Sequence, residues 1–447
     1  MNPFSKHFAP SGLELGRRDF IKKSVLGGVS LGAMAGLPIE DLVAHVTSGV
    51  NRNSSPSDLK ITDLRYVLVD HLDRATPIIR IDTNQGIYGL GEVRENADPR
   101  LALKLKSKIL GQNPCNVERI FKSIKRYGGQ YKEGSGVAAI ETACWDLAGK
   151  AFGVPCWQML GGRFRDKIRL YTDFMGDANF DNLAPRIKHR TEVEGFTWIK
   201  MTRCYYVVGA IEGGYVYETE NILSQKGIDA LVEYFGKVRD LIGYDIPVSA
   251  DHFRASDLNS MIRLGKAVEP FKLAWMEDPL RWQNTAQLKQ LKESIEIPVL
   301  TGENMYLKES FKEICDAQAV DIVHPDQASA GGLLETKKIG DYAQDKGISM
   351  AQHFTGTAIS YMANVHIAAA TENSMVLEFH QEGDEIPEML NMVNVVEDKP
   401  IYADGFAYVP DEAPGLGITL NEEGIKAILH PKDRSYFKPT LEWNEWI

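Results

Sequence analysis

Cysteine is scarce in this sequence, and long apolar runs are absent after its N-terminus. The five cysteines are an odd number and form no close CxxC pair, which argues against both a disulfide framework and a zinc site. No apolar run beyond the N-terminal segment is long enough to span a bilayer. Basic residues are fewer than acidic ones, 50 against 61, so the net charge is −11. Nucleic acid is therefore not expected as the main partner.

What remains is an ordinary globular composition in a long chain. The 447 residues are 44% hydrophobic and 25% charged. This length is sufficient for a large core or for two domains.

The first 35 residues differ from the rest. Arg17 and Arg18 precede Phe20 and a Gly-rich, mildly apolar stretch, and "AMA" then offers a small-residue cleavage site. These features predict a twin-arginine export signal over residues 1–35 and a periplasmic protein, with a short amphipathic helix as the alternative. Residues 36–58 have linker composition and are expected to tether the folded part.

Residues 59–165 are predicted to form an α+β domain. The segment "KITDLRYVLVDHLDRATPIIRIDT" alternates polar and apolar residues, and "NQGIYGLGEV" adds a turn and another strand. The stretch from Pro99 to Gly162 has a helical pattern instead. An antiparallel meander followed by helices is the expected arrangement.

Residues 166–390 repeat one unit, in which a short apolar strand ends in a polar residue and a helical stretch follows. Eight such units predict parallel strands with helical crossovers that close into a (β/α)₈ barrel. A longer Gly- and Tyr-rich insertion follows the second strand. Residues 391–447 show no further unit and are expected to pack on the α+β domain. The eight strands are "KIRLYTD", "FTWIKMT", "IPVSAD", "LAWMED", "IPVLTGEN", "VDIVHPD", "GISMAQH" and "SMVLEFH".

Three consecutive strands of this barrel carry carboxylates at their ends: Asp251, Glu277 and Glu303. The carboxyl ends of barrel strands form the active site of such folds. Three converging carboxylates repel one another unless a cation neutralises them, and oxygen-only ligands suit Mg²⁺. The alternative for any single carboxylate is a helix N-cap.

The remaining strand ends supply candidate catalytic groups. Asp326 and His353 end neighbouring strands, so they can form the hydrogen-bonded pair that a general base needs. Lys200 ends the second strand, where it is either a base or a supporting cation. Glu378 ends the last strand and could donate a hydrogen bond if protonated, or orient a substrate hydroxyl.

The order Lys–Asp–Glu–Glu–Asp–His–Glu on successive strands, after an α+β domain, resembles the enolase superfamily. The motifs "GLGEV", "WMEDPL", "TGEN" and "DQASAGGL" are similar to those of its mandelate racemase/muconate lactonizing enzyme branch, which includes acid-sugar dehydratases. The resemblance implies one Mg²⁺ per subunit, held by Asp251, Glu277 and Glu303. It also implies an enediolate intermediate and a homo-oligomer.

Two departures from that branch bear on the reaction. Racemases and cycloisomerases of the branch usually carry K-x-K on the second strand, whereas this chain has Lys200 and Thr202, and threonine cannot abstract the proton. Dehydratases often place a histidine two residues after the metal aspartate, where this chain has Phe253. His252 comes one residue early and should point the other way on a strand.

The favoured hypothesis is a Mg²⁺-dependent sugar-acid dehydratase (a hydro-lyase) that uses His353, oriented by Asp326, as its single base. The β-hydroxyl would leave with help from the same histidine or from another group, giving a 2-keto-3-deoxy acid. The alternatives are an epimerase, racemase or cycloisomerase of a related (anhydro)sugar acid, and a non-catalytic acid-sugar binding protein. Candidate substrate contacts are Asn304, Thr202, His252 and Arg203.

Overall fold

The computed structural model describes residues 55–174, 179–216, 221–254 and 257–445, all within one compact unit, Asn53–Ile447. The predicted export signal and most of the predicted linker lie outside the described residues. The end of that linker, Pro56–Asp58, forms a short 3₁₀ helix. Within the described part of the chain, every helix is too short or too polar to cross a membrane.

The N-terminal part of the unit is an antiparallel sheet packed on helices. Its three strands pair in the order β1–β2–β3, as the alternating pattern predicts. Helix α6 (Ser135–Phe152) packs on this sheet and is buried along most of its length. It ends at Gly153, whose φ of 73° is the left-handed conformation favoured at helix C-termini. The other elements here are β1 (Ile61–His71), β2 (Arg74–Thr83), β3 (Tyr88–Glu92), α3 (Arg100–Leu103), α4 (Lys106–Ile109), α5 (Val117–Ile124) and α7 (Cys156–Met159).

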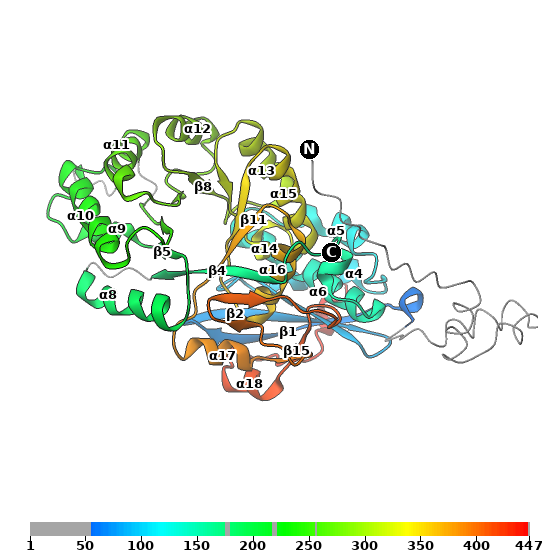
Figure 1. Cartoon of the computed structure of the whole chain (residues 1–447). Helices are drawn as coiled ribbons and strands as arrows, with labels where there is room; N and C mark the ends of the chain where they lie inside the picture. Colours follow the sequence, from blue (N-terminus) through cyan, green and yellow to red (C-terminus); the bar gives the residue numbers. More distant parts are fainter. Residues whose placement is uncertain (1–54, 175–178, 217–220, 255–256, 446–447) are drawn as a thin grey trace, which may run out of the picture. The chain divides into compact units, whose positions relative to one another are not determined.

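Eight parallel strands, β4 to β11, follow in sequence order and each pairs with the next. Pairing between β11 and β4 closes them into a barrel, which confirms the predicted fold (Figure 1). The strands are β4 (Lys167–Phe174), β5 (Ile199–Met201), β6 (Val248–Ala250), β7 (Met276–Glu277), β8 (Val299–Thr301), β9 (Ile322–Val323), β10 (Ser349–Gln352) and β11 (Ser374–Phe379).

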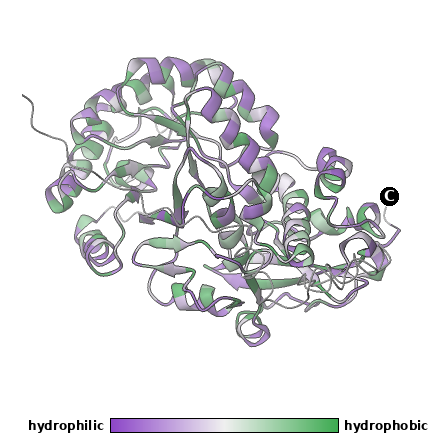
Figure 2. Cartoon of the chain, turned by 45° about the vertical axis from the view of Figure 1, so that its right-hand side comes forward, coloured by the Kyte–Doolittle hydropathy of each residue, from purple (hydrophilic) through white to green (hydrophobic). Residues whose placement is uncertain are grey.

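Helices surround this barrel, with hydrophilic residues on their outward sides and hydrophobic residues toward the strands (Figure 2). This distribution is the one expected for amphipathic helices that cover a buried parallel sheet. The helices are α8 (Phe180–Lys188), α9 (Cys204–Gly209), α10 (Gln225–Ile242), α11 (Leu258–Val268), α12 (Thr285–Ser294), α13 (Leu307–Asp316), α14 (Gln327–Ala330), α15 (Leu333–Asp345) and α16 (Ala358–Ala370).

The C-terminal segment contacts both preceding parts. The backbone N–H of His430 donates to the carbonyl of Leu68 at 3.0 Å, on strand β1 of the N-terminal sheet. Strand β14 pairs antiparallel with barrel strand β4, so the tail also extends the barrel sheet. Its elements are α17 (Glu385–Asn391), β12 (Val393–Val395), β13 (Tyr402–Ala403), β14 (Phe406–Tyr408), β15 (Ile418–Leu420) and α18 (Glu422–Ala427).

A buried histidine on α16 predicts loss of stability in mild acid. His366 is fully buried and its Nδ1 accepts a hydrogen bond from the backbone N–H of Trp157, so burial lowers its pKa to about 4. As pH falls from about 6.5 to 4, the unfolded chain binds a proton that the folded chain does not. This histidine should therefore make the free energy of unfolding about 3 kcal/mol smaller over that interval.

Denaturant unfolding at several pH values tests this prediction. His366→Asn keeps an acceptor for Trp157 but cannot titrate, so its unfolding free energy should depend less steeply on pH. The exposed His189, replaced by Asn, is the control and should keep the slope of the parent. Equal slopes for His366→Asn and the parent would contradict the prediction.

Candidate active site

The carboxyl ends of three neighbouring barrel strands carry the three predicted metal ligands. Asp251 follows β6 directly, Glu277 ends β7, and Glu303 comes two residues after the end of β8. All three side chains are largely buried, with exposed fractions of 4%, 1% and 18%. Gly302 precedes Glu303 with a φ of 145°, and a side chain there would meet the backbone of His324. This turn therefore positions Glu303 and requires glycine.

Lys200, on β5, lies among these carboxylates. Its Nζ is 3.1 Å from Glu277 Oε1 and 3.5 Å from Asp251 Oδ2, and it forms a closer ion pair with Glu378. Although burial opposes it, Glu277 and Glu378 hold the pKa of Lys200 well above its usual value. With its Nζ paired with three carboxylates, Lys200 fits the supporting cation.

Glu378, on β11, is ionised in this arrangement. Burial would raise its pKa, but Lys200, followed by His380 and His353, holds the pKa well below its usual value. The sequence hypothesis that a protonated Glu378 donates a hydrogen bond is therefore not supported by this geometry. Its oxygens instead accept, including from the backbone N–H of Phe354 at 3.3 Å.

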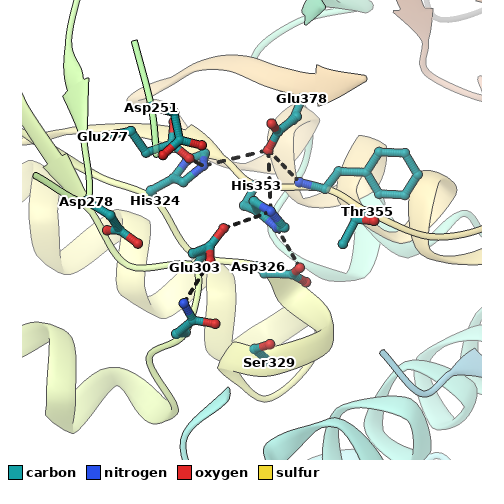
Figure 3. A network of polar contacts seen from close by, with 12 residues as sticks. Asp251, Glu277, Asp278, Glu303, His324, Asp326, Ser329, His353, Thr355 and Glu378 are labelled. Atoms are coloured by element: carbon teal, nitrogen blue, oxygen red, sulfur yellow. Dashed lines mark hydrogen bonds and ion pairs between the residues drawn. The ribbon is translucent and has the colours of Figure 1, made fainter. Parts of the chain in front are cut away.

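His353 and Asp326 form the predicted pair on the next two strands. His353 Nδ1 lies 2.7 Å from Asp326 Oδ2, and the two residues form an isolated parallel bridge. The carboxylate therefore fixes the tautomer and leaves Nε2 directed toward Glu303 Oε2, 3.0 Å away (Figure 3). Although burial opposes it, Glu378 and Glu303 hold the pKa of His353 well above its usual value.

The predicted substrate contacts around Thr202 do not follow strand alternation. Strand β5 ends at Met201 and β6 at Ala250, and both Arg203 and His252 have left-handed φ angles of 53° and 55°. Strand alternation predicts that His252 points away from the metal ligands, and this prediction is wrong because the ring lies beside Asp251. Its Nδ1 is 2.6 Å from Asp251 Oδ2 and 2.8 Å from Thr202 Oγ1. Asp251 raises the pKa of His252 to about 9.

The two other predicted contacts, Asn304 and Arg203, have different neighbours. Asn304 Nδ2 donates to Glu303 Oε1 at 2.7 Å, so this side chain is directly attached to the site. Arg203 occupies the N-cap position of helix α9 without a side-chain capping hydrogen bond, and its guanidinium lies 5.8 Å from the ring of Tyr206 on that helix.

Three residues of the site were missed in the sequence. His324, just after β9, places Nε2 3.2 Å from Glu277 Oε1 and donates from Nδ1 to the carbonyl of Ala351. His380, just after β11, places Nδ1 2.7 Å from Asp173 Oδ1. Both follow the carboxyl end of a barrel strand directly, so the rule that such ends form the site could have found them.

Arg94 is the third missed residue and comes from the N-terminal domain, after β3. Its Nη1 donates to the carbonyl of Glu303 at 2.9 Å and to Ser329 Oγ at 2.7 Å, and its Nε lies 3.7 Å from Asp326 Oδ2. No local pattern in the sequence signals this contact, because it depends on how the two domains dock.

The tightest cluster of potential metal donors differs from the predicted one. Among the residues that the structure describes, the one set of three such donors within 4.8 Å of one another is His353, Glu378 and His380. Asp251, Glu277 and Glu303 are more widely spaced, and each is paired with a cationic or amide group of the chain.

Two family models match the chain. One, described as the mandelate racemase/muconate lactonizing enzyme N-terminal domain, matches residues 71–161. The other, described as enolase C-terminal domain-like, matches residues 182–424. Together they cover the N-terminal domain from the end of β1 and the barrel from α8 onward.

Relatives and solved structures agree with these matches. A D-xylonate dehydratase of Haloferax volcanii is 30% identical, over 87% of this chain and 93% of that protein. A D-galactonate dehydratase of Pectobacterium atrosepticum is 29% identical, over 77% of this chain and 88% of that protein.

Among solved structures, a mandelate racemase/muconate lactonizing enzyme-like protein of Rubrobacter xylanophilus has a TM-score of 0.77 at 28% identity, covering 85% of this chain and all (100%) of that one. The 3,6-anhydro-D-galactonate cycloisomerase of Zobellia galactanivorans has a TM-score of 0.71 at 26% identity, and the match covers 83% of this chain and 99% of that one. The strand-end residues, the closed barrel and these matches show that the chain belongs to the mandelate racemase/muconate lactonizing enzyme branch of the enolase superfamily.

Proposed function

We propose that this chain is a sugar-acid dehydratase, a hydro-lyase that removes the proton α to a carboxylate and eliminates the β-hydroxyl to give a 2-keto-3-deoxy acid. The observation that carries the proposal is the His353–Asp326 pair, which presents one imidazole Nε2 to a cluster of buried carboxylates. The face of β5 offers no second base, because Lys200 Nζ is paired with three carboxylates and Thr202 cannot act as one. The dehydratase names of relatives at 29% and 30% identity support the same reaction.

One Mg²⁺ is the proposed cofactor, with Asp251, Glu277 and Glu303 as its ligands. The donor set fits a hard cation, because all three donors are carboxylates. The local charge also fits, because burial and then Glu303, Glu277 and Asp251 raise the pKa of the adjacent Asp278 to about 8. Negative charge is thus in excess on this side of the site. When bound, the ion would neutralise the substrate carboxylate and stabilise the charge that develops as the α-proton leaves.

The chain's own groups have distinct parts in this proposal. His353 takes the α-proton at Nε2, while Asp326 holds the ring through Nδ1. Nε2 becomes free for substrate only when Glu303 binds a partner other than His353. Lys200 stays charged beside Glu277 and limits the repulsion among the carboxylates. Asn304, Thr202 and His252 lie close enough to the ligand carboxylates to contact a bound acid.

A second candidate function is the isomerisation of an anhydrosugar acid. It is favoured by the structural similarity to the Zobellia galactanivorans cycloisomerase, at a TM-score of 0.71. Against it stands Thr202, where two-sided chemistry would need a base. A non-catalytic binding protein is disfavoured by the intact histidine–aspartate pair and carboxylate cluster.

A substrate panel tests the proposal directly. Purified protein starting at residue 55 is incubated with aldonic, aldaric and anhydrosugar acids and Mg²⁺, and 2-keto acid is detected as its semicarbazone. At least one aldonic or aldaric acid should give a 2-keto-3-deoxy acid. Binding of acids without any turnover, or isomerised product without keto acid, would contradict the proposal and favour one of the two alternatives.

A further inference from the structure

The site contains a second histidine–aspartate pair that resembles the first. His380 Nδ1 lies 2.7 Å from Asp173 Oδ1, and His353 Nδ1 lies 2.7 Å from Asp326 Oδ2. Both aspartate side chains are almost completely buried, with exposed fractions of 3% and 1%. In each pair the carboxylate occupies Nδ1, so Nε2 is the nitrogen left for chemistry.

The two imidazoles are close neighbours. Their ring centroids are 6.2 Å apart, and one nitrogen of each lies within 4.8 Å of the other and of a Glu378 oxygen. His380 Nε2 is 3.5 Å from Glu378 Oε1, while His353 Nε2 is 3.7 Å from Glu378 Oε2. The two histidines are therefore neighbours, each beside a different oxygen of the Glu378 carboxylate. This spacing allows them to reach substituents on adjacent carbon atoms of one small substrate.

A purely structural reason for the second pair is weak. The seam between β4 and β11 is already joined by backbone pairing, which sets Phe379 opposite Thr172. The His380 ring also reaches beyond the seam, because its Nε2 lies 3.5 Å from Glu378 Oε1 and its centroid 6.2 Å from that of His353. A hydrogen bond that only joined the two strands would not require an imidazole whose Nε2 faces the carboxylate next to the proposed base.

The other groups of the site are poorly suited to donate a proton to a leaving hydroxyl. Glu378 is held ionised, and Lys200 is engaged with three carboxylates. His252 is bound to Asp251, a proposed metal ligand.

His324 is fully buried and directs Nε2 at Glu277, another proposed metal ligand. Among the imidazoles that the structure describes in the site, His380 is then the one left with a ring oriented by a carboxylate outside the proposed ligand set and with His353 beside it.

We infer that His380 is the general acid of the dehydration, oriented by Asp173; this inference rests on the proposed function. The α-carbon–hydrogen bond breaks and its proton goes to His353 Nε2. The electron pair moves into the acid, the β-carbon–oxygen bond then breaks, and the His380 Nε2 proton joins the departing hydroxyl as water. The enol that remains takes up a proton at the β-carbon and releases its hydroxyl proton to solvent, becoming the 2-keto-3-deoxy acid. His353 releases the α-proton to solvent, and His380 regains one proton from solvent, so the enzyme returns to its starting state.

The variant His380→Asn tests this assignment, because the asparagine amide can still donate to Asp173 while Nε2 is lost. With the best hydroxy acid of the panel, keto-acid formation should fall about 100-fold, a typical loss for a positioned general acid. In D₂O, exchange of the α-proton should continue in the recovered acid, because His353 is intact. His189→Asn, on the exposed side chain beside Glu194, is the control and should leave both rates unchanged.

A substrate with a fluorine in place of the β-hydroxyl separates chemistry from folding. Fluoride leaves without accepting a proton, so His380→Asn should release fluoride from the 3-deoxy-3-fluoro analogue at close to the parent rate. Equal losses on the hydroxy and fluoro acids, or no loss on either, would overturn the assignment. Because the result is a ratio within one variant, partial unfolding does not affect it. If the parent forms keto acid from no acid of the panel, the proposed function fails and the assignment fails with it.

Discussion

Replacing His353 with asparagine should lower keto-acid formation by about 10⁴-fold, the upper end of what a positioned acid–base group contributes. The asparagine amide can still donate to Asp326, whose oxygen lies 2.7 Å from Nδ1 of the histidine, so the site should keep its shape. What is lost is Nε2, the atom that faces the carboxylate cluster. Exchange of the substrate's α-proton in D₂O should be lost to the same extent, because no other group can take that proton.

The two readouts separate His353 from His380. In His353→Asn, both exchange and elimination should vanish, whereas His380→Asn should lose elimination alone. The same exposed control, His189→Asn, should retain both activities. Exchange that persists at the parent rate in His353→Asn would show that another group is the base.

Removal of the metal should have the next largest effect. After treatment with EDTA the parent should lose its activity, and Mg²⁺ should restore it. In Asp251→Asn one of the three proposed charged ligands becomes a neutral amide, and the turnover rate at a fixed Mg²⁺ concentration should fall about 10³-fold, since Lewis-acid stabilisation amounts to several kcal/mol. Higher Mg²⁺ concentrations should restore part of that rate.

The measurement is a Mg²⁺ titration of initial rates, with calorimetry of Mg²⁺ binding to the same samples. Asp240→Asn, an exposed carboxylate on helix α10, is the matched control and should titrate like the parent. Full activity of the EDTA-treated parent would contradict the proposed cofactor. An unchanged Mg²⁺ affinity in Asp251→Asn would remove that residue from the ligand set.

The sequence predicted the barrel and most of its strand-end residues, for a simple geometric reason. All strands of a parallel barrel end at one face, so a polar residue after each apolar strand falls into the same site. That rule located Lys200, Asp326, His353 and Glu378, which the structure brings into one connected set of ion pairs and hydrogen bonds.

The same rule failed where the chain leaves the strand. His252 was expected to point away, but β6 ends at Ala250 and the left-handed backbone at His252 turns its ring back to Asp251. Strand alternation predicts nothing about such turns. His324 and His380 were within reach of the rule, because each directly follows the carboxyl end of a barrel strand.

Arg94 could not have been predicted from any local pattern. It follows a strand of the N-terminal sheet, yet its guanidinium contacts the carbonyl of Glu303 and the side chain of Ser329 in the barrel. Such contacts depend on how two domains dock, and a periodicity within one element carries no information about docking. The contact nonetheless ties the N-terminal domain to the Asp326–His353 pair.

Dehydration with a single base on one side of the α-carbon can be followed by proton NMR of the parent enzyme in D₂O. An active sugar acid from the panel is followed until about half has reacted. One-sided dehydration should give a 2-keto-3-deoxy acid with deuterium at C3, and recovered starting acid with its original configuration at the α-carbon. A deuterated epimer of the starting acid, formed without keto acid, would contradict it.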